Sequence, residues 1–182
     1  MNITKKIIIG FSTTPSSLVS TAIRAVEQTP YSHVYLKRYS SYYNKWLVYQ
    51  ANNDGIYFIT EKTFLSQGNK IIKEYELEVT KEEEKEMISH AMDMLGTPYG
   101  KLQILGMFYT RVVYSLFKKK VKNPLSDGKQ TQVCSELLYN LIKNRFPEHS
   151  DGDPEFDGPK WIEGWVAHHG EKTYDITEEN NG

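Results

Sequence analysis

Apolar and polar residues in the first half of the chain follow patterns typical of β-strands. The run over residues 5–11 is mostly apolar and predicts a buried strand. Three later runs are rich in β-branched and aromatic residues and predict further strands over residues 31–36, 46–51 and 55–59. Over residues 71–79 apolar and charged residues alternate, so we expect a strand with one face largely in water.

Between and after these strands, apolar residues recur with the period of a helix. Thr14 is expected to cap a first helix, with Pro15 in the first helical position that proline favours. Thr80 and Glu83 match a capping box that opens a second helix, and Gly96 suits its end. Further helices are predicted over residues 102–117 and between Thr131 and Pro147, and a short helix or strand over residues 161–166.

Together these patterns predict an α+β fold, in which a small antiparallel sheet packs against helices. Residues 1–169 are expected to form a single domain, since the 182-residue chain is 39% hydrophobic and can bury a sizeable core. Residues 170–182 are polar and are expected to form a flexible tail.

The composition of the chain excludes several classes of function. The formal net charge is −1, so no overall basic field indicates a nucleic-acid partner. The chain has one cysteine, which excludes an internal disulfide framework and zinc sites of paired cysteines. The histidines have no convincing metal-ligand spacing, and no metal or cofactor is expected. The first residues do not form a signal-peptide core and no apolar run reaches the length of a membrane span, so we expect a cytoplasmic protein.

The strongest local asymmetry of charge lies in an apolar and basic segment over residues 101–125. An apolar, helical stretch ends in the sequence Lys118-Lys119-Lys120-Val121-Lys122. One interpretation is a core helix whose basic end complements the helix dipole. The other is peripheral contact of residues 102–122 with an anionic lipid surface.

Cys134 is expected in or next to the first turn of a helix for which Thr131 is a reasonable N-cap and Pro147 a stop. In a first helical turn, unpaired N–H groups and the helix dipole favour a thiolate and can also hold an oxyanion. On position alone, a lone cysteine such as Cys134 is more often a small buried hydrophobe, and it shares the apolar face of Leu137 and Leu138.

His33 is the histidine on a confidently predicted strand. If the strands over residues 31–36 and 46–51 form a hairpin that turns at Ser41-Tyr42, His33 lies directly opposite Gln50, and Tyr35 opposite Val48. Directly opposed side chains are close enough to hydrogen-bond. A thiol acyl-transfer site needs a base for the cysteine and a group that orients the imidazole, and His33 and Gln50 could fill these roles.

Four short motifs in this order resemble the circularly permuted NlpC/P60 papain-like cysteine hydrolases. They are Tyr31-Ser32-His33-Val34, Tyr49-Gln50-Ala51, Leu95-Gly96-Thr97-Pro98-Tyr99 and Val133-Cys134-Ser135-Glu136-Leu137. The resemblance implies a permuted papain-like architecture with Cys134 as nucleophile, His33 as base and Gln50 as the third polar residue. It also places Tyr99, Tyr31 and Ser32 in the substrate cleft. Many relatives carry an acidic residue at the position of Gln50, so Asn52 is an alternative third residue.

The resemblance implies a bacterial or phage cysteine peptidase or amidase that cleaves an amide bond, most simply in a cell-wall peptide. Without an export signal, access to peptidoglycan would need help such as carriage by a phage particle. Two alternatives stay open. One is a lipid acyltransferase or thioesterase at a membrane surface, and the other is a non-catalytic binding module on the same fold.

Overall fold

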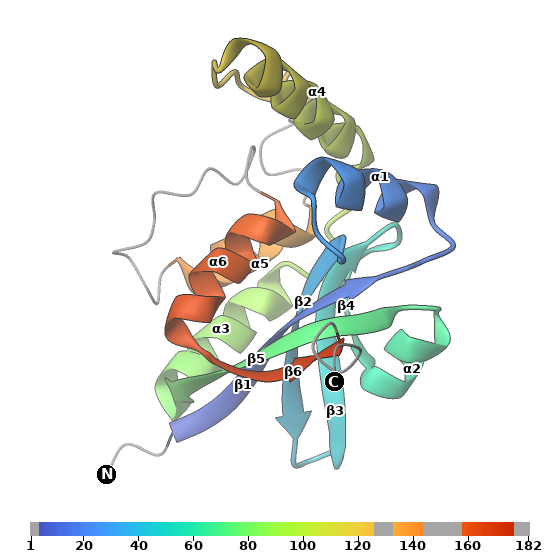
Figure 1. The fold of residues 1–182 in the computed structure, drawn as a ribbon. Helices are drawn as coiled ribbons and strands as arrows, with labels where there is room; N and C mark the ends of the chain where they lie inside the picture. The colour runs from blue at the N-terminus through green and yellow to red at the C-terminus, as the bar shows by residue number, and fades with distance from the viewer. Residues whose placement is uncertain (1–3, 126–132, 144–157, 177–182) are drawn as a thin grey trace.

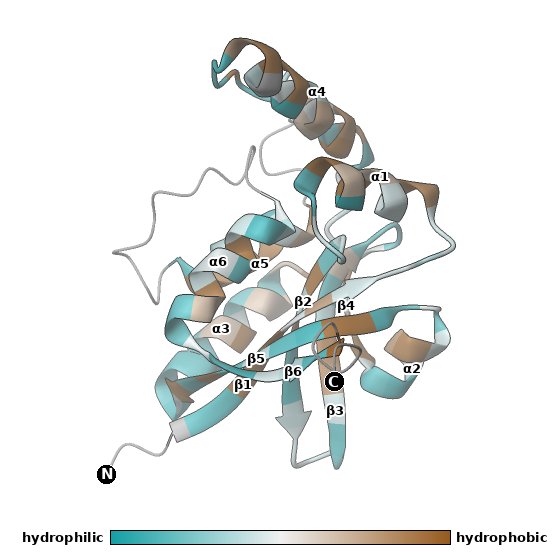
Figure 2. Cartoon of the chain, viewed as in Figure 1, coloured by the Kyte–Doolittle hydropathy of each residue, from teal (hydrophilic) through white to brown (hydrophobic). Residues whose placement is uncertain are grey.

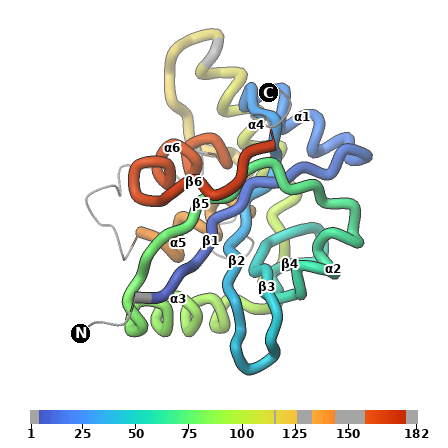
Figure 3. The backbone as a smooth tube through the Cα atoms, turned by 60° about the horizontal axis from the view of Figure 1, so that its bottom comes forward, coloured from blue at the N-terminus to red at the C-terminus, as the bar shows by residue number. Residues whose placement is uncertain are grey.

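The structure is a computed structural model that describes residues 4–125, 133–143 and 158–176. It is an α+β fold built on a six-stranded antiparallel sheet, as the sequence predicts (Figure 1). The strands run in the order β4-β3-β2-β1-β5-β6 across the sheet, as Figure 3 shows. They are β1 (Thr4–Thr13), β2 (His33–Ser40), β3 (Lys45–Asn52), β4 (Gly55–Thr60), β5 (Lys70–Thr80) and β6 (Glu171–Asp175). The helices are α1 (Leu18–Glu27), α2 (Glu61–Ser66), α3 (Lys81–Asp93), α4 (Lys101–Phe117), α5 (Cys134–Ile142) and α6 (Pro159–His169).

The main core lies on one face of the sheet, beneath α3, α5 and α6. Alternate residues of the strands, such as Ile9, Phe11 and Val34, point to this face and are fully buried. Leu137 of α5 and Val166 of α6 pack against these strand residues and are also fully buried. On the opposite face, α2 covers a smaller cluster of Tyr35, Val48 and Phe64. The sequence analysis did not predict α2.

Two strand predictions need correction. Residues from 170 onward were expected to form a flexible tail, but Glu171–Asp175 forms the edge strand β6. Such a strand pairs through its backbone and needs no apolar pattern. Because β5 lies between β1 and β6, its polar face is also less exposed than predicted. Glu74 is 8% exposed, accepts a hydrogen bond from the Tyr35 hydroxyl at 2.8 Å, and pairs with Lys37 at 2.6 Å.

The predicted hairpin of β2 and β3 forms, but its register differs by two residues. Tyr39 pairs with Trp46 and Leu36 with Tyr49, so the predicted pairing of Tyr35 with Val48 is wrong. The turn spans four residues, 41–44, and ends at Asn44, whose φ of 51° lies in the left-handed region that asparagine tolerates. Side chains alternate with a period of two, so this shift leaves Gln50 on the face that was predicted.

The first helix begins later than predicted. Ser17, not Thr14, is the N-cap of α1, and its hydroxyl accepts a hydrogen bond from the backbone N–H of Ser20. The Thr14 side chain instead donates to Asn69 at 2.9 Å, which ties the loop before the helix to the end of α2. The capping box of Thr80 and Glu83 is confirmed at the start of α3.

The prediction that α4 is a core helix is wrong. Leu102 is 65% exposed, Leu116 is 70% exposed and Phe117 is 72% exposed. Among the described helices, none is long and apolar enough to cross a membrane.

Candidate active site

Cys134 is the first residue of α5, in the first turn as predicted. The N-cap is Val133, in extended conformation and without a side-chain cap, so the prediction of Thr131 as N-cap is wrong. Thr131 and Pro147 both lie outside the described residues. The helix is held by its apolar residues, since Leu137 and Leu141 are buried against the sheet and its covering helices.

Two opposing effects act on the Cys134 thiol. Backbone N–H groups of Val34, Ser135 and Cys134 itself donate to the sulfur and lower its pKa. Burial acts in the other direction and is the larger effect, so the pKa of Cys134 rises to about 11. The side chain is 4% exposed. The expectation that the helix start favours a thiolate is therefore not met in this conformation, because desolvation outweighs the helix N–H groups.

The contact with Val34 places the sulfur at a gap in the sheet. The ladder between β2 and β3 runs from Ser40 paired with Lys45 to Leu36 paired with Tyr49, and does not reach His33 or Val34. There β2 pairs only with β1. The backbone N–H of Val34 lies close enough to the Cys134 sulfur to lower its pKa, so α5 begins where β2 and β3 part.

His33 and Gln50 meet across this gap. The distance between His33 Nε2 and Gln50 Oε1 is 2.8 Å. Continued in the observed register, His33 comes level with Asn52 and diagonal to Gln50, a separation that long side chains can span. Asn52 instead accepts a hydrogen bond from the backbone N–H of Asp54 at 2.9 Å, within its own turn. Gln50, and not Asn52, therefore orients His33.

This contact fixes the form of the imidazole. An amide oxygen only accepts, so Nε2 of His33 carries the hydrogen and Nδ1 is left as the basic nitrogen. Burial lowers the pKa of His33 to about 4, against the opposing effect of the hydrogen bond to Gln50. At neutral pH the site therefore holds a neutral imidazole and a neutral thiol.

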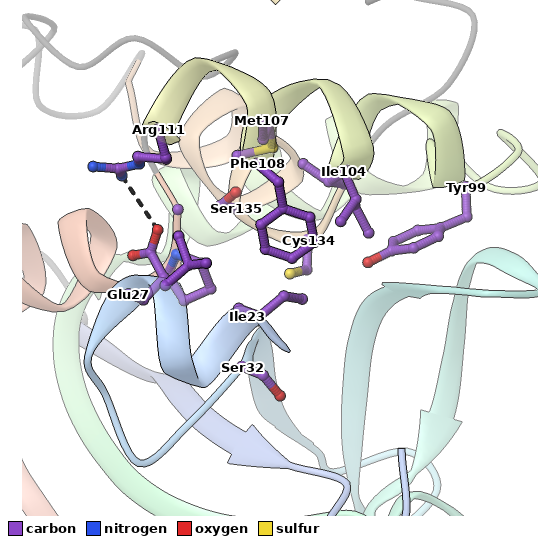
Figure 4. Close-up of a pocket in the computed structure, with 14 residues that line it drawn as sticks. Ile23, Glu27, Ser32, Tyr99, Ile104, Met107, Phe108, Arg111, Cys134 and Ser135 are labelled. Carbon is purple, nitrogen blue, oxygen red and sulfur yellow. Dashed lines mark ion pairs between the residues drawn. The ribbon is translucent and has the colours of Figure 1, made fainter. Parts of the chain in front are cut away.

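His33 and Cys134 line two adjoining cavities. His33 and Gln50 line a cleft of about 400 Å³. The other walls of this cleft are largely polar and include Thr14, Ser17, Asn52, Asn53, Asp54, Gln67 and Asn69. Cys134 lines a smaller pocket of about 40 Å³, whose apolar walls include Ile23, Val26, Ile104, Met107 and Phe108 (Figure 4). Ser32 and Tyr99 line both cavities. Among the described interactions, no hydrogen bond joins Cys134 directly to His33.

The three predicted substrate-binding residues differ in position. Tyr99 points toward the Cys134 thiol (Figure 4) and hydrogen-bonds it, and burial raises the pKa of its hydroxyl well above the usual value. The Ser32 hydroxyl lies 2.5 Å from that of Ser20. Tyr31 lies apart from both cavities, because its fully buried ring packs in the main core and its hydroxyl donates to Glu163.

Helices α1 and α4 form walls of the Cys134 pocket, a role that the sequence pattern did not predict. Ile104 and Phe108, one turn apart on α4, lie over the sulfur (Figure 4). Beside them, Arg111 pairs with Glu27 of α1 at 3.2 Å. The periodicity of residues 102–117 indicated a helix. However, apolar residues occur on several of its sides, so the pattern could not show which side faces the site.

The described residues include no group of three or more His, Cys, Asp or Glu side chains that could hold a metal ion. The polar groups of the site instead bond one another, as His33 does with Gln50. The arrangement supplies a thiol, a basic imidazole nitrogen and backbone N–H donors, which are the parts of acyl-transfer chemistry.

The sequence matches no protein-family model and no curated protein. The fold is similar to that of a solved structure, the metalloprotein yiiX from Escherichia coli O157:H7, a DUF1105 protein. That match has a TM-score of 0.59 at 16% sequence identity, and it covers 96% of this chain and 97% of the other. At this identity the likeness concerns the fold alone.

Proposed function

We propose that the protein is a cysteine hydrolase of the permuted NlpC/P60 papain-like type, in which Cys134 attacks a carbonyl and His33 acts as the base. The observation that carries this proposal is the 2.8 Å contact between His33 and Gln50. It leaves the second ring nitrogen of His33 free to act as a base, and the cleft that His33 lines shares Ser32 and Tyr99 with the Cys134 pocket. The order of the chain, with the histidine strand before the cysteine helix, fits the permuted arrangement.

In the proposed reaction, the Cys134 sulfur bonds to the carbonyl carbon while His33 Nδ1 takes the thiol proton. Backbone N–H groups at the start of α5 hold the oxyanion. The bond to the leaving group then breaks, and His33 returns the proton to the leaving nitrogen. Water hydrolyses the thioester and restores the thiol. Because the pKa of Cys134 is raised to about 11, base-assisted attack is favoured over a preformed thiolate–imidazolium pair.

An amide bond in a peptide of the cell-wall type is the first candidate substrate. The cleft beside His33 supports it, because amide and hydroxyl side chains such as Asn53, Gln67 and Thr14 can hydrogen-bond a peptide backbone. The second candidate is an acyl ester or thioester of a lipid. The apolar wall of Ile104 and Phe108 beside the sulfur favours it, because hydrocarbon gains free energy when it leaves water for such a surface.

The test compares hydrolysis of two substrate sets: cell-wall-type peptides, and acyl thioesters of increasing chain length. Intact-protein mass spectrometry would follow the acyl group on Cys134. We expect Cys134→Ala to abolish turnover and His33→Ala to lower kcat by about 10²- to 10⁴-fold. Gln50→Ala should lower kcat with a smaller change in KM, because Gln50 acts by orienting the base. His168→Ala, an exposed histidine on α6, is the matched control.

Turnover that survives Cys134→Ala would overturn the proposal. So would a folded wild-type protein that neither turns over nor forms an acyl adduct with any member of either set. That result would identify a binding module on this fold.

A further inference from the structure

Two neighbouring helices, α1 and α4, present apolar side chains to solvent. On α1, Leu18 is 88% exposed and Val19 53% exposed. On α4, exposed apolar side chains recur at spacings of three and four residues and so lie along one side of the helix. They are Leu102, Leu105, Tyr109, Val112 and Leu116, each at least 54% exposed.

The inner sides of the same helices carry polar groups. Ser20 and Glu27 of α1 are buried, as are Gln103 and Thr110 of α4. A surface helix normally buries its apolar stripe and exposes its polar residues. Both helices depart from that rule, although Ile104 of α4 is also buried, and the apolar residues on their outer sides are not explained by packing within the described part of the chain.

The two apolar sides belong to one end of the molecule. Arg111 of α4 pairs with Glu27 of α1 at 3.2 Å, and both helices line the Cys134 pocket. Figure 2 shows hydrophobic residues along both helices, which lie next to each other at the top of the view. We call the exposed apolar side chains of α1 and α4 the α1–α4 face.

The charged side chains that the α4 segment contributes beside this face are all positive. Residues 101–125 contain six Lys or Arg and no Asp or Glu. Lys118, Lys119, Lys120 and Lys122 follow the apolar stripe of α4 directly, and all four are exposed. An apolar stripe beside a cluster of lysines is the composition of helices that lie in the headgroup region of anionic membranes.

We propose that the α1–α4 face docks onto the surface of an anionic lipid bilayer, with the apolar side chains among the acyl chains and the lysines at the headgroups. A second copy of this chain fits the face less well, because residues 101–125 carry no acidic side chain that could pair with the lysines of a partner across a two-fold contact. The docking surface goes beyond the proposed function and does not depend on the thiol chemistry. Protein with Cys134→Ala should therefore bind equally well.

The test is flotation of the full chain with two kinds of vesicle, one of phosphatidylcholine alone and one containing about a third phosphatidylglycerol. We expect binding to the anionic vesicles that weakens as salt is raised. Leu105→Glu combined with Leu116→Glu should lower the partition coefficient at least tenfold. Lys118→Ala, Lys119→Ala and Lys120→Ala together should lower it about a hundredfold, from about fivefold per lysine near the surface.

Matched controls lie on other elements. Met92→Glu replaces an apolar side chain of α3 that is 53% exposed, and Lys81→Ala with Lys85→Ala removes exposed lysines from the same helix. These variants should float like the wild type. Circular dichroism would check that every variant is folded, and all the substituted side chains are exposed.

Three results would overturn the proposal. The first is a folded wild-type protein that stays unbound with both vesicle compositions. The second is a stable dimer in light scattering that the substitutions at Leu105 and Leu116 dissolve, which would make the face a self-interface. The third is vesicle binding that the control variants weaken as much as the α4 variants do.

Discussion

The raised pKa of Cys134 leads to a measurable prediction about α4. Burial holds the pKa of the thiol at about 11. An exposed cysteine has a pKa of about 8.5, so at pH 7.5 about one thiol in ten is ionised. With a pKa of 11 the ionised fraction falls to about one in 3,000. Ionisation alone should therefore slow the alkylation of Cys134 by about 300-fold relative to a free thiol.

The perturbation that tests the cause is Phe108→Ala. The Phe108 ring lies over the sulfur and forms part of a pocket of only about 40 Å³ (Figure 4). A water molecule needs about 10–15 Å³ of such space and two or more polar partners. Loss of the ring opens the pocket further, and the thiol and the Tyr99 hydroxyl can serve as partners. We expect hydration to lower the pKa of Cys134 by at least one unit, and the alkylation rate at pH 7.5 to rise at least tenfold.

The assay is iodoacetamide alkylation from pH 6 to pH 11, followed by intact-protein mass spectrometry. The midpoint of the pH profile reports ionisation, whereas its plateau reports access to the sulfur. The matched control is Tyr109→Ala, because Tyr109 is the next residue of the same helix but is 54% exposed. A wild-type midpoint near 8.5 would refute the reasoning. A Phe108→Ala profile in which only the plateau rises would show that α4 limits access without controlling the pKa.

Three further predictions concern the sheet. The pKa of His33 is lowered to about 4, so the folded state disfavours the charged imidazole and loses stability as the pH falls from about 6.5 to 4. The His33→Ala variant should lack this loss in urea unfolding. Nitrogen NMR of the wild type should show the Nε2–H tautomer of His33, and an Nδ1–H tautomer would contradict the 2.8 Å contact with the Gln50 oxygen. Gly10→Ala should cost about 1–3 kcal/mol, because the new Cβ would lie 2.1 Å from the Tyr35 ring. Gly164→Ala meets nothing within 4 Å and is the control, and equal unfolding midpoints for the two variants would contradict the packing argument.

The sequence predicted most elements of the fold because the patterns on which they rest are local. The capping box of Thr80 and Glu83 and the apolar strands each depend on neighbouring residues alone. Strand β6 could not be predicted in this way, since residues 171–175 pair through their backbone with β5, nearly a hundred residues earlier in the chain.

The candidate site was predicted in part, for similar reasons. The pairing of His33 with Gln50 was expected from an incorrect register, and it forms because a shift of two residues keeps both side chains on the same face. The pKa of Cys134 could not be predicted, because it depends on burial, and residues that line the pocket around the thiol, such as Ile104 and Phe108, come from a distant helix. Tyr31 lies next to Ser32 in sequence, but its side chain enters the core.

The shared wall of the two cavities restricts the shape and polarity of any molecule that occupies both. Ser32 and Tyr99 line both the larger His33 cleft, whose walls are amide and hydroxyl groups, and the smaller Cys134 pocket, whose walls are apolar. A ligand that occupies both cavities needs a hydrogen-bonding group in the His33 cleft and a narrow apolar group in the Cys134 pocket. A uniformly polar compound would match the Cys134 pocket poorly, and a uniformly apolar compound would match the His33 cleft poorly. Amphipathic molecules are therefore the natural starting set for a ligand screen.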